Sequence, residues 1–549
     1  MSTRTGVCNF CGTGCGHLLD VRDGAVRGVF ASPGHPVSRG RLCVRGWHIH
    51  ELLATRERIV SPAIRTDGRL RPVPYEEALA YAADRLGRYS GDELAFLASP
   101  RASNEDNFLM ARLARTVCRT PHIGLASDQG HGAAAEVLLE GTGWPAMSGS
   151  LAEVRKARFI LVVGSDIAKL NPIVGSEIHL AARGGARLVL LAPRSAQMAR
   201  LSGDHLWTRP GSLRHVLAAA AKVLVEKGWH DEAFVRERTE GFDGFARSLA
   251  GLDLEALAAA SGLTVPVIED LARGLAQAPA AMAFFTTGIA SLDRDTVALL
   301  HGLFLAAGKT GREGCGVNPV PGVANIVGAT DVGASNRFLA GHRRAEGPEA
   351  GRTPRELLAD PASPLKALVA ADRDEGIVRH AGRIKGLELL LYIGAYTNPF
   401  ADLAHVVLPA ASYAEADGTY TNAERRVQLN RKKVEPPPGV RPAWRVYADL
   451  AAKLGAAWTF DSAEAVMDGI AAAAPAYAGV TYAKLERGHG LQWPVDAARP
   501  DGTVRLDAAA GPRRLRFVAV PASLQAPAPS AEFPFLLMAG KANYFWHRN

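Results

Sequence analysis

Apolar residues follow two different periods along the middle of the chain. Short apolar runs at residues 157–163 and 186–191 flank residues 173–183, where apolar positions recur three and four residues apart. A short continuous run is typical of a buried strand, and recurrence every three to four residues is typical of a helix with one face on a core. Alternation of the two favours a parallel sheet covered by helices. The pattern therefore predicts an α/β fold.

The same two patterns recur on both sides of this segment. Alternation at residues 17–29 predicts a small pair of strands. Residues 340–375 are charged, contain proline and lack a period, which predicts a surface excursion. We expect helices at residues 75–88, 104–117, 213–228 and 295–307, and strands at residues 93–98, 281–288, 387–393 and 405–408.

Length, charge and hydropathy restrict the class of protein. A chain of 549 residues exceeds the size of one hydrophobic core, so we expect several domains. No apolar stretch reaches the length of a membrane span, and we expect no signal peptide because the first residues run directly into a cysteine motif. The net charge of +8 comes with scattered arginines and no interleaved aromatic residues, which argues against nucleic acid as a partner. We expect a cytoplasmic chain, able to dock on the cytoplasmic face of the inner membrane through partner subunits.

Four of the six cysteines are gathered near the start of the chain with the spacing C-x2-C-x3-C-x27-C. An iron–sulfur cube needs four thiolates, which a tight loop and one distant arm can supply. A structural zinc site usually takes its ligands from two C-x2-C pairs, whereas here there is one triplet and one single residue. The spacing therefore predicts a [4Fe–4S] cluster as the metal site, with the ligands Cys8, Cys11, Cys15 and Cys43.

Three glycines lie within the cysteine loop, namely Gly12, Gly14 and Gly16. We expect them to supply the positive φ angles that wrap the loop around a cluster. The other two cysteines, Cys118 and Cys315, have apolar or glycine-rich surroundings and are interpreted as core thiols. A disulfide framework is therefore not expected, and the chain belongs in a reducing compartment.

Three motifs in a fixed order carry a resemblance. They are the cysteine motif with CGTGCG at residues 11–16, GVNPVPGVAN running on to GATDVG at residues 316–333, and LPAA through DGTYTN to ERRVQ at residues 408–428. Together they resemble the molybdopterin-dinucleotide oxidoreductase family, most closely the large subunit of cytoplasmic formate dehydrogenases. The similarity spans essentially residues 5–549.

The resemblance implies a fold with an N-terminal [4Fe–4S] domain, two interleaved α/β domains of doubly wound type and a C-terminal β-barrel-like domain that is largely absent. The implied parts are residues 1–58 as the cluster domain, 59–125 with 324–445 as a discontinuous α/β domain, 126–323 as an α/β dinucleotide-binding-like domain, 446–532 as an α-rich segment and linker, and 533–549 as the start of a truncated molybdopterin-dinucleotide-binding domain.

The resemblance also implies a set of residues for molybdopterin guanine dinucleotide. Carboxyl ends of parallel strands are where open α/β sheets bind such ligands. Gly322 and Asn325 match the family's glycine/asparagine loop near the metal. Arg45 stands where formate dehydrogenases have a lysine between cluster and pterin, and an arginine keeps the charge but not the compact ammonium. The remaining matches fall in turns, namely Gly164, Ser165, Asp166, Pro193, Arg194 and Gly288.

Two residues depart from the formate dehydrogenase pattern. The position of the cysteine or selenocysteine that ligates the metal is Gly130, which has no side chain. The position of the formate-orienting arginine is Pro321, which carries no charge. His131, which follows the ligand position, is the remaining catalytic candidate, with a structural histidine as the alternative. The resemblance therefore leaves binding of molybdenum or tungsten doubtful.

The pattern of a complete cluster and a missing metal ligand is similar to the large peripheral-arm subunit of NADH:quinone oxidoreductase, complex I. We expect an electron-transfer subunit whose partners are other redox subunits, either ferredoxin-like or NADH-oxidising with flavin. The N-terminal [2Fe–2S] domain of such subunits is not found here. Two alternatives stay open: a catalytic molybdenum or tungsten enzyme of formate dehydrogenase type, and a structural protein that keeps the cluster as a folding staple.

Overall fold

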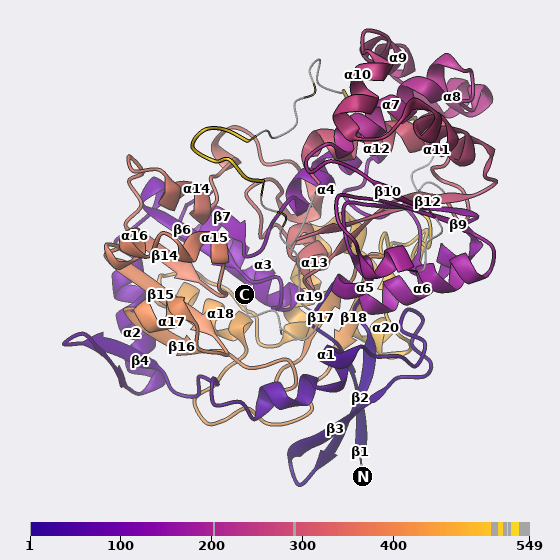
Figure 1. Ribbon diagram of the computed structural model, residues 1–549. Coiled ribbons are helices and arrows are strands. Elements are labelled where there is room, and N and C mark those ends of the chain that lie inside the picture. Colours follow the sequence, from indigo (N-terminus) through magenta and orange to yellow (C-terminus); the bar gives the residue numbers. More distant parts are fainter. Residues whose placement is uncertain are drawn as a thin grey trace. The chain divides into compact units, whose positions relative to one another are not determined.

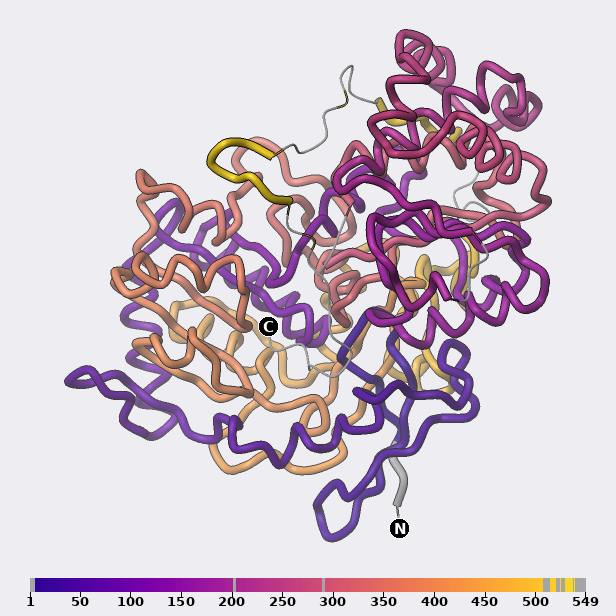
Figure 2. The backbone as a smooth tube through the Cα atoms, viewed as in Figure 1, coloured from indigo at the N-terminus to yellow at the C-terminus, as the bar shows by residue number. Residues whose placement is uncertain are grey.

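The computed structural model describes residues 2–200, 204–288, 292–506, 514–519, 524, 529–536 and 538 (Figure 1). The chain divides into two compact units. Unit 1 contains residues 1–128 and 323–502, and unit 2 contains residues 129–322 with the described residues beyond 502. The backbone trace shows indigo, violet and orange segments interleaved in unit 1 (Figure 2). Unit 2 is therefore an insertion into unit 1, and the finer division into five parts remains a prediction.

Unit 1 is built on a seven-stranded sheet with the order β5-β4-β16-β15-β14-β6-β7. The strands from β16 to β7 are parallel, and β4 and β5 add an antiparallel edge. Every residue of β6, β14, β15 and β16 is buried, as expected for a parallel sheet covered on both faces. The strands are β4 (Ala63–Thr66), β5 (Arg69–Pro72), β6 (Leu94–Ala98), β7 (Ile123–Leu125), β14 (Ala367–Ala370), β15 (Leu389–Gly394) and β16 (Val406–Pro409).

Helices cover both faces of this sheet. On one face lie α2 (Tyr75–Leu86), α3 (Asn104–Arg112) and α18 (Ala443–Lys453). The other face buries Leu357, Ile377, Ile384 and Phe400 from α14 (Pro354–Ala359), α15 (Glu375–Val378), α16 (Ala381–Lys385) and α17 (Pro399–Leu403). The remaining helices of unit 1 are α1 (Val44–Trp47), α13 (Ile326–Asp331), α19 (Ala463–Ala473) and α20 (Tyr482–Glu486).

The helix predicted at residues 104–117 changes its type part of the way along. Ser103 caps its start through a reciprocal capping box with Asp106. The α-helix ends at Arg112, and residues Leu113–Val117 form a π-helix. π-Helical turns are rare, and the spacing of apolar residues alone does not distinguish them from α-helical turns.

The prediction of a surface excursion at residues 340–375 is wrong near its C-terminal end. β14 (Ala367–Ala370) pairs with both β6 and β15, and its four residues are buried. The charged residues and prolines around this short apolar run led to the prediction of a surface segment. The strand's position in the sheet follows from pairing with segments far away in the sequence.

Two small antiparallel sheets complete unit 1. The predicted strand pair at residues 17–29 is confirmed as part of β1 (Ser2–Val7), β2 (Gly16–Arg22) and β3 (Ala25–Ala31). The second sheet contains β17 (Gly418–Thr421), β18 (Arg426–Asn430) and β19 (Leu491–Gln492). β1 lies against β18, and the Val7 N–H donates to the Asn430 side chain. The N-terminal sheet is thereby joined to a hairpin more than 400 residues later.

Unit 2 contains an all-parallel sheet with the order β10-β9-β8-β12-β13. The α/β pattern predicted from the apolar runs is confirmed here. The strands are β8 (Phe159–Val163), β9 (Arg187–Ala192), β10 (Asp204–Trp207), β12 (Ala281–Thr287) and β13 (Gly316–Pro321), and β11 (Thr239–Glu240) pairs separately with β20 (Leu515–Arg516).

The core of unit 2 lies between this sheet and its buried helices. Phe159, Leu161 and Val163 of β8 face the same core as α7 (Leu213–Glu226) and α12 (Arg294–Ala306). The other helices are α4 (His131–Thr142), α5 (Ile167–Leu170), α6 (Pro172–Arg183), α8 (Glu232–Arg238), α9 (Phe242–Ala250), α10 (Leu254–Ser261) and α11 (Val265–Gln277).

Short 3₁₀ turns connect several elements, at Ile49–Leu53, Gly91–Glu93, Leu151–Lys156, Gln197–Arg200, Ala340–His342, Gly347–Glu349 and Pro475–Tyr477. Within the described residues, no helix has the length and apolar character needed to cross a membrane. Most of the predicted segment 533–549 lies outside the described residues. Only residues 533–536 and 538 of this segment are described.

Candidate iron–sulfur site and strand-end site

The four predicted cluster ligands come together in unit 1. Cys8, Cys11 and Cys15 are carried by the loop between β1 and β2, and Cys43 immediately precedes α1. The Cys8 N–H donates to the Cys15 carbonyl over 2.8 Å, which closes the loop. Burial, and then the nearby sulfurs of Cys11 and Cys43, raise the pKa of the Cys8 thiol. Binding of iron must therefore release protons from buried thiols.

The four sulfurs form a donor set suited to a cluster. In the described part of the chain, no three His, Cys, Asp or Glu side chains surround the position of a single metal ion. A [4Fe–4S] cube instead takes four thiolates spread around its surface. Cys8, Cys11 and Cys15 are buried, each about 5% exposed, and Cys43 is half-buried. The residues fit the predicted cluster.

The glycines of the loop serve two different purposes. Gly14 has a φ of 60°, and a Cβ there would lie 2.5 Å from Nε2 of Gln428. Gly12 and Gly16 do not have positive φ angles, so the prediction that they need one is wrong. At Gly16 a Cβ would overlap the ring of His35, whose Nε2 is 2.7 Å from the Gln428 side-chain oxygen. Close packing, rather than backbone conformation, requires glycine at that position.

Arg45 lies beside the cysteines, as the resemblance implies. Its side chain is 6% exposed and is hydrogen-bonded to Cys43. Burial by itself lowers the pKa of this guanidinium, but the sulfurs of Cys11 and Cys43 raise it above its usual value. Net charge and hydrogen bonds to sulfur set the reduction potential of a cluster. Arg45 is therefore placed to raise that potential.

The loop rests on a segment that sequence reasoning did not assign to the site. The Ala423 N–H donates to the Gly12 carbonyl over 2.7 Å, and the Asn422 amide donates to the Thr13 carbonyl over 3.2 Å. Both residues follow β17, inside the third motif that carried the resemblance. That motif was the available signal, but nothing in it indicated a contact with the first residues of the chain.

Asn325, a predicted cofactor residue, is engaged within unit 1. Its N–H donates to the Pro100 carbonyl, and its side-chain amide donates to the Ala102 carbonyl. Its side-chain oxygen accepts from the Thr421 N–H over 2.6 Å. The residue is fully buried and ties β17 to the start of α3. These contacts favour a structural part for its side chain.

In unit 2, the predicted dinucleotide residues gather at one edge of the sheet. Each stands directly after the carboxyl end of a parallel strand. Gly164, Ser165 and Asp166 follow β8, Pro193 and Arg194 follow β9, Gly288 follows β12, and Gly322 follows β13. The strands are neighbours in the sheet, so the structure brings these turns together. This is the edge where open α/β sheets bind nucleotide-like ligands.

Unpartnered polar atoms lie in and next to these turns. A few per cent at most of buried polar atoms in proteins lack a hydrogen-bond partner, so a group of them calls for an explanation. A polar ligand with phosphates and hydroxyls would satisfy them, and the residues therefore fit a pterin dinucleotide. The atoms are Ser165 Oγ, Asp166 Oδ1, Asn171 Oδ1 and Thr286 Oγ1.

Position 130, where the resemblance places the family's metal ligand, lies in unit 2. Gly130 has a φ of 69° and immediately precedes α4. His131 is buried, and its Nδ1 is 3.1 Å from the Thr287 hydroxyl at the end of β12. The carbonyl of Pro321 accepts a hydrogen bond from the Asn171 amide over 2.8 Å. A cysteine-ligated metal and a formate-orienting cation therefore do not fit the residues at 130 and 321.

Comparison with known proteins gives the family. A model described as molybdopterin oxidoreductase matches residues 58–453, and one described as molybdopterin oxidoreductase Fe4S4 domain matches residues 1–54. In fold, the chain is similar to acetylene hydratase from Pelobacter acetylenicus, with a TM-score of 0.73 at 16% identity over 97% of this chain and 80% of that chain.

Two relatives are similar over most of their length. F420-dependent formate dehydrogenase 2 subunit alpha of Methanococcus maripaludis is 32% identical over 523 residues, which cover 90% of this chain and 77% of the relative. F420-dependent formate dehydrogenase subunit alpha of Methanocaldococcus jannaschii is 30% identical over an alignment of 570 residues, covering 98% and 84%. The resemblance inferred from the three motifs is confirmed, and the chain belongs to the molybdopterin oxidoreductase family, including its N-terminal Fe4S4 domain.

Proposed function

We propose that this chain is a [4Fe–4S] electron-transfer subunit of an oxidoreductase complex, organised like the large peripheral-arm subunit of NADH:quinone oxidoreductase. The observation that carries the proposal is Gly130. The cluster donor set is complete, with three buried cysteines and the half-buried Cys43, whereas the position of the catalytic metal ligand has no side chain. The chain would then pass electrons without binding substrate at a metal.

The backbone at position 130 supports this interpretation. A non-glycine residue with φ near +60° costs about 1–2 kcal/mol, because its Cβ approaches the following carbonyl oxygen. A φ of 69° therefore favours glycine over the cysteine that formate dehydrogenases carry there. Pro321 likewise supplies no positive charge for a carboxylate substrate. Both departures act against formate chemistry.

The chain's own residues would control electron transfer at the cluster. When bound, the cluster supplies a one-electron carrier. Cys8, Cys11, Cys15 and Cys43 would hold it, and Arg45 would favour its reduced form by adding positive charge. The partners would be a donor and an acceptor subunit, ferredoxin-like or NADH-oxidising with flavin. The subunit names of the two relatives support such an assembly.

A second candidate is a catalytic molybdenum or tungsten oxidoreductase of formate dehydrogenase type. The unpartnered polar atoms at the strand ends of unit 2 favour it, because they suit a bound dinucleotide. The identity of 30–32% to formate dehydrogenase alpha subunits also favours it. His131 would then be the group able to hold a proton, although its contact with Thr287 also suits a structural part.

Elemental analysis of anaerobically purified protein separates the two candidates. Iron, molybdenum, tungsten and zinc are measured per chain, pterin is assayed, and a reversible EPR signal is sought. About four irons without molybdenum or tungsten, with a reversible signal, supports the electron-transfer subunit. Stoichiometric molybdenum or tungsten with pterin overturns it in favour of the enzyme. Zinc alone contradicts the cluster itself.

A further inference from the structure

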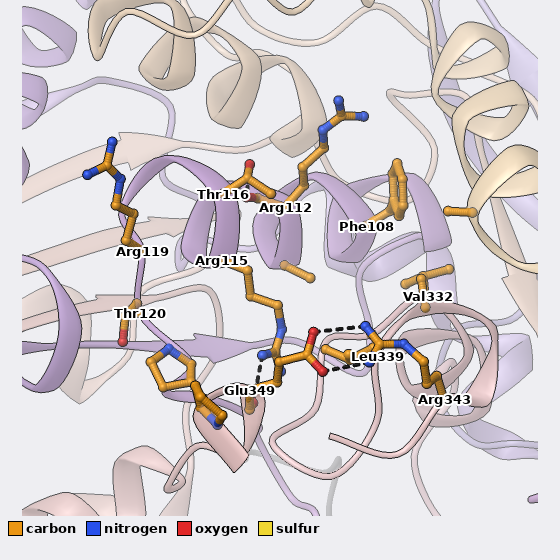
Figure 3. A pocket seen from close by; sticks show the side chains of 16 residues that line it. Phe108, Arg112, Arg115, Thr116, Arg119, Thr120, Val332, Leu339, Arg343 and Glu349 are labelled. Carbon is orange, nitrogen blue, oxygen red and sulfur yellow. Dashed lines mark hydrogen bonds and ion pairs between the residues drawn. The ribbon is translucent and has the colours of Figure 1, made fainter. Parts of the chain in front are cut away.

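Unit 1 contains an arginine-lined cavity that the proposed function does not use. Its volume is about 570 Å³, and it lies along the π-helix Leu113–Val117 and the turn before β7 (Figure 3). Thr120 and Pro121, which line it, precede the first residue of β7. The cavity is therefore at the amino end of β7. Open α/β sheets bind nucleotide-like ligands at the opposite, carboxyl ends.

The charged residues of this cavity are four arginines and one glutamate, which leaves an excess of three positive charges. Arg112, Arg115 and Arg119 come from one helix and its end, and Arg343 comes from the other wall. Arg343 makes two hydrogen bonds to the Glu349 carboxylate, 2.6 and 2.8 Å long. The opposite charges of this pair cancel, so the net positive charge of the cavity comes from Arg112, Arg115 and Arg119.

Those three arginines have no carboxylate hydrogen-bonded to them among the described residues. Arg115 donates to the carbonyls of Glu349 and Ser335, and its buried Nε has no partner. The Arg112 guanidinium lies over the ring of Trp458, 5.3 Å from its centre. Arg119 has a φ of 54°, which is strained for a residue with a side chain. Cations held without anions in a cavity are suited to an anionic ligand.

The rest of the lining indicates a ligand that is more than an inorganic ion. Phe108, Val332 and Leu339 present apolar surface to the same cavity. Figure 3 shows Arg115 and Arg343 reaching Glu349 from opposite sides, while Arg112 and Arg119 extend from the helix in other directions. A ligand with separated anionic groups on an apolar body would match cations that point in different directions beside apolar surface.

We propose that this cavity binds a small organic polyanion, a molecule with two or more phosphate or carboxylate groups on an organic body. Its anionic groups would bind Arg112 and Arg119, beside the positive charge of Arg115, and its body would cover the apolar wall. Glu349 would oppose binding, because it occupies Arg343 and repels the ligand. The site shares no residue with the cluster loop or with the strand-end turns of unit 2.

Isothermal titration of the full chain with ADP, citrate and inorganic phosphate tests the proposal. Arg119→Gly relieves the positive φ while removing one cation, so it should fold and should weaken binding about tenfold, as expected for a lost charge-assisted bond. Glu349→Gln should strengthen binding. Arg247→Ala is the control, because Arg247 is an exposed arginine on α9 of unit 2.

The outcomes separate the sources of the anion. Binding of ADP alone would identify a nucleotide site, binding of citrate alone a carboxylate site, and binding of both a general polyanion site. Each supports the proposal only if Arg119→Gly and Glu349→Gln change affinity in opposite directions and Arg247→Ala does not change it. The proposal is wrong if neither variant changes the affinity, if phosphate alone binds, or if none of the three compounds binds.

Discussion

The cluster loop of unit 1 and the strand-end edge of unit 2 differ in what each retains. At the cluster loop, all four cysteines are present, three of them buried and Cys43 half-buried, and Arg45 supplies a compensating charge. At the strand-end edge, unpartnered polar atoms suit a dinucleotide, but Gly130 offers no metal ligand. The difference teaches that an electron carrier and a catalytic metal depend on separate residues, so one can be kept while the other is lost.

The largest effect is expected from removing a cluster ligand. Cys15→Ser should abolish the brown visible absorbance and most of the bound iron, and it should destabilise the N-terminal sheet by several kcal/mol, because cluster binding contributes to folding. Cys118→Ser is the control, since Cys118 is buried directly after the π-helix Leu113–Val117 and is not among the predicted ligands. Loss of absorbance in the control instead would mean that the ligand set is wrongly assigned.

A second variant tests how closely the loop between β1 and β2 packs against its neighbours. Gly14→Ala places a methyl group at a positive φ and against Gln428 and Asn422, so a loss of about 2–4 kcal/mol is expected. Gly24→Ala has a similar φ of 73° but open space around it, so it should cost only about 1–2 kcal/mol. The thermal midpoint of absorbance loss is the measurement. Equal shifts would show that contact with Gln428 does not matter.

A third variant changes Gly130 in unit 2. Gly130→Cys should lower stability by about 1–2 kcal/mol and should not bring in molybdenum, tungsten or formate oxidation. Gly143→Cys, at the left-handed residue after the same helix, is the matched control for strain. Metal content and formate-dependent dye reduction are measured. Recruited metal with activity would favour the catalytic candidate.

A smaller effect is expected at Arg45. Arg45→Gln removes a positive charge beside Cys43, so the reduced cluster is less stabilised and its reduction potential should fall by tens of millivolts. Arg45→Lys should recover most of the change, because it keeps the charge. EPR-monitored redox titration gives both values. An unchanged reduction potential in the glutamine variant would show that Arg45 does not influence the cluster.

The smallest effect concerns the strand ends of unit 2. Ser165→Ala deletes an unpartnered buried hydroxyl, so pterin-free protein should gain up to about 1 kcal/mol, whereas pterin retention should fall. Ser212→Ala should instead destabilise the protein by about 1 kcal/mol, since that hydroxyl donates to the Arg209 carbonyl over 2.7 Å. Thermal midpoints and pterin content are compared. A destabilised Ser165→Ala with unchanged pterin would argue against a ligand at this edge.

The sequence by itself determined the features that depend on local spacing. Apolar periods located β8, α6 and β9, because a residue's period decides which face it presents to a core. The cysteine spacing selected the four residues whose sulfurs the structure brings together. Three motifs identified the family.

Tertiary structure alone decided the rest, because those features arise from partners far away in the chain. β14 lies in a charged, proline-containing segment, and its place in the sheet follows from its pairing with β6 and β15. The segment after β17 supports the cluster loop through backbone and amide bonds that span about 400 residues. Gly16 is required by the His35 ring rather than by its φ. Residue type and local period record none of these contacts, since each depends on where another segment packs.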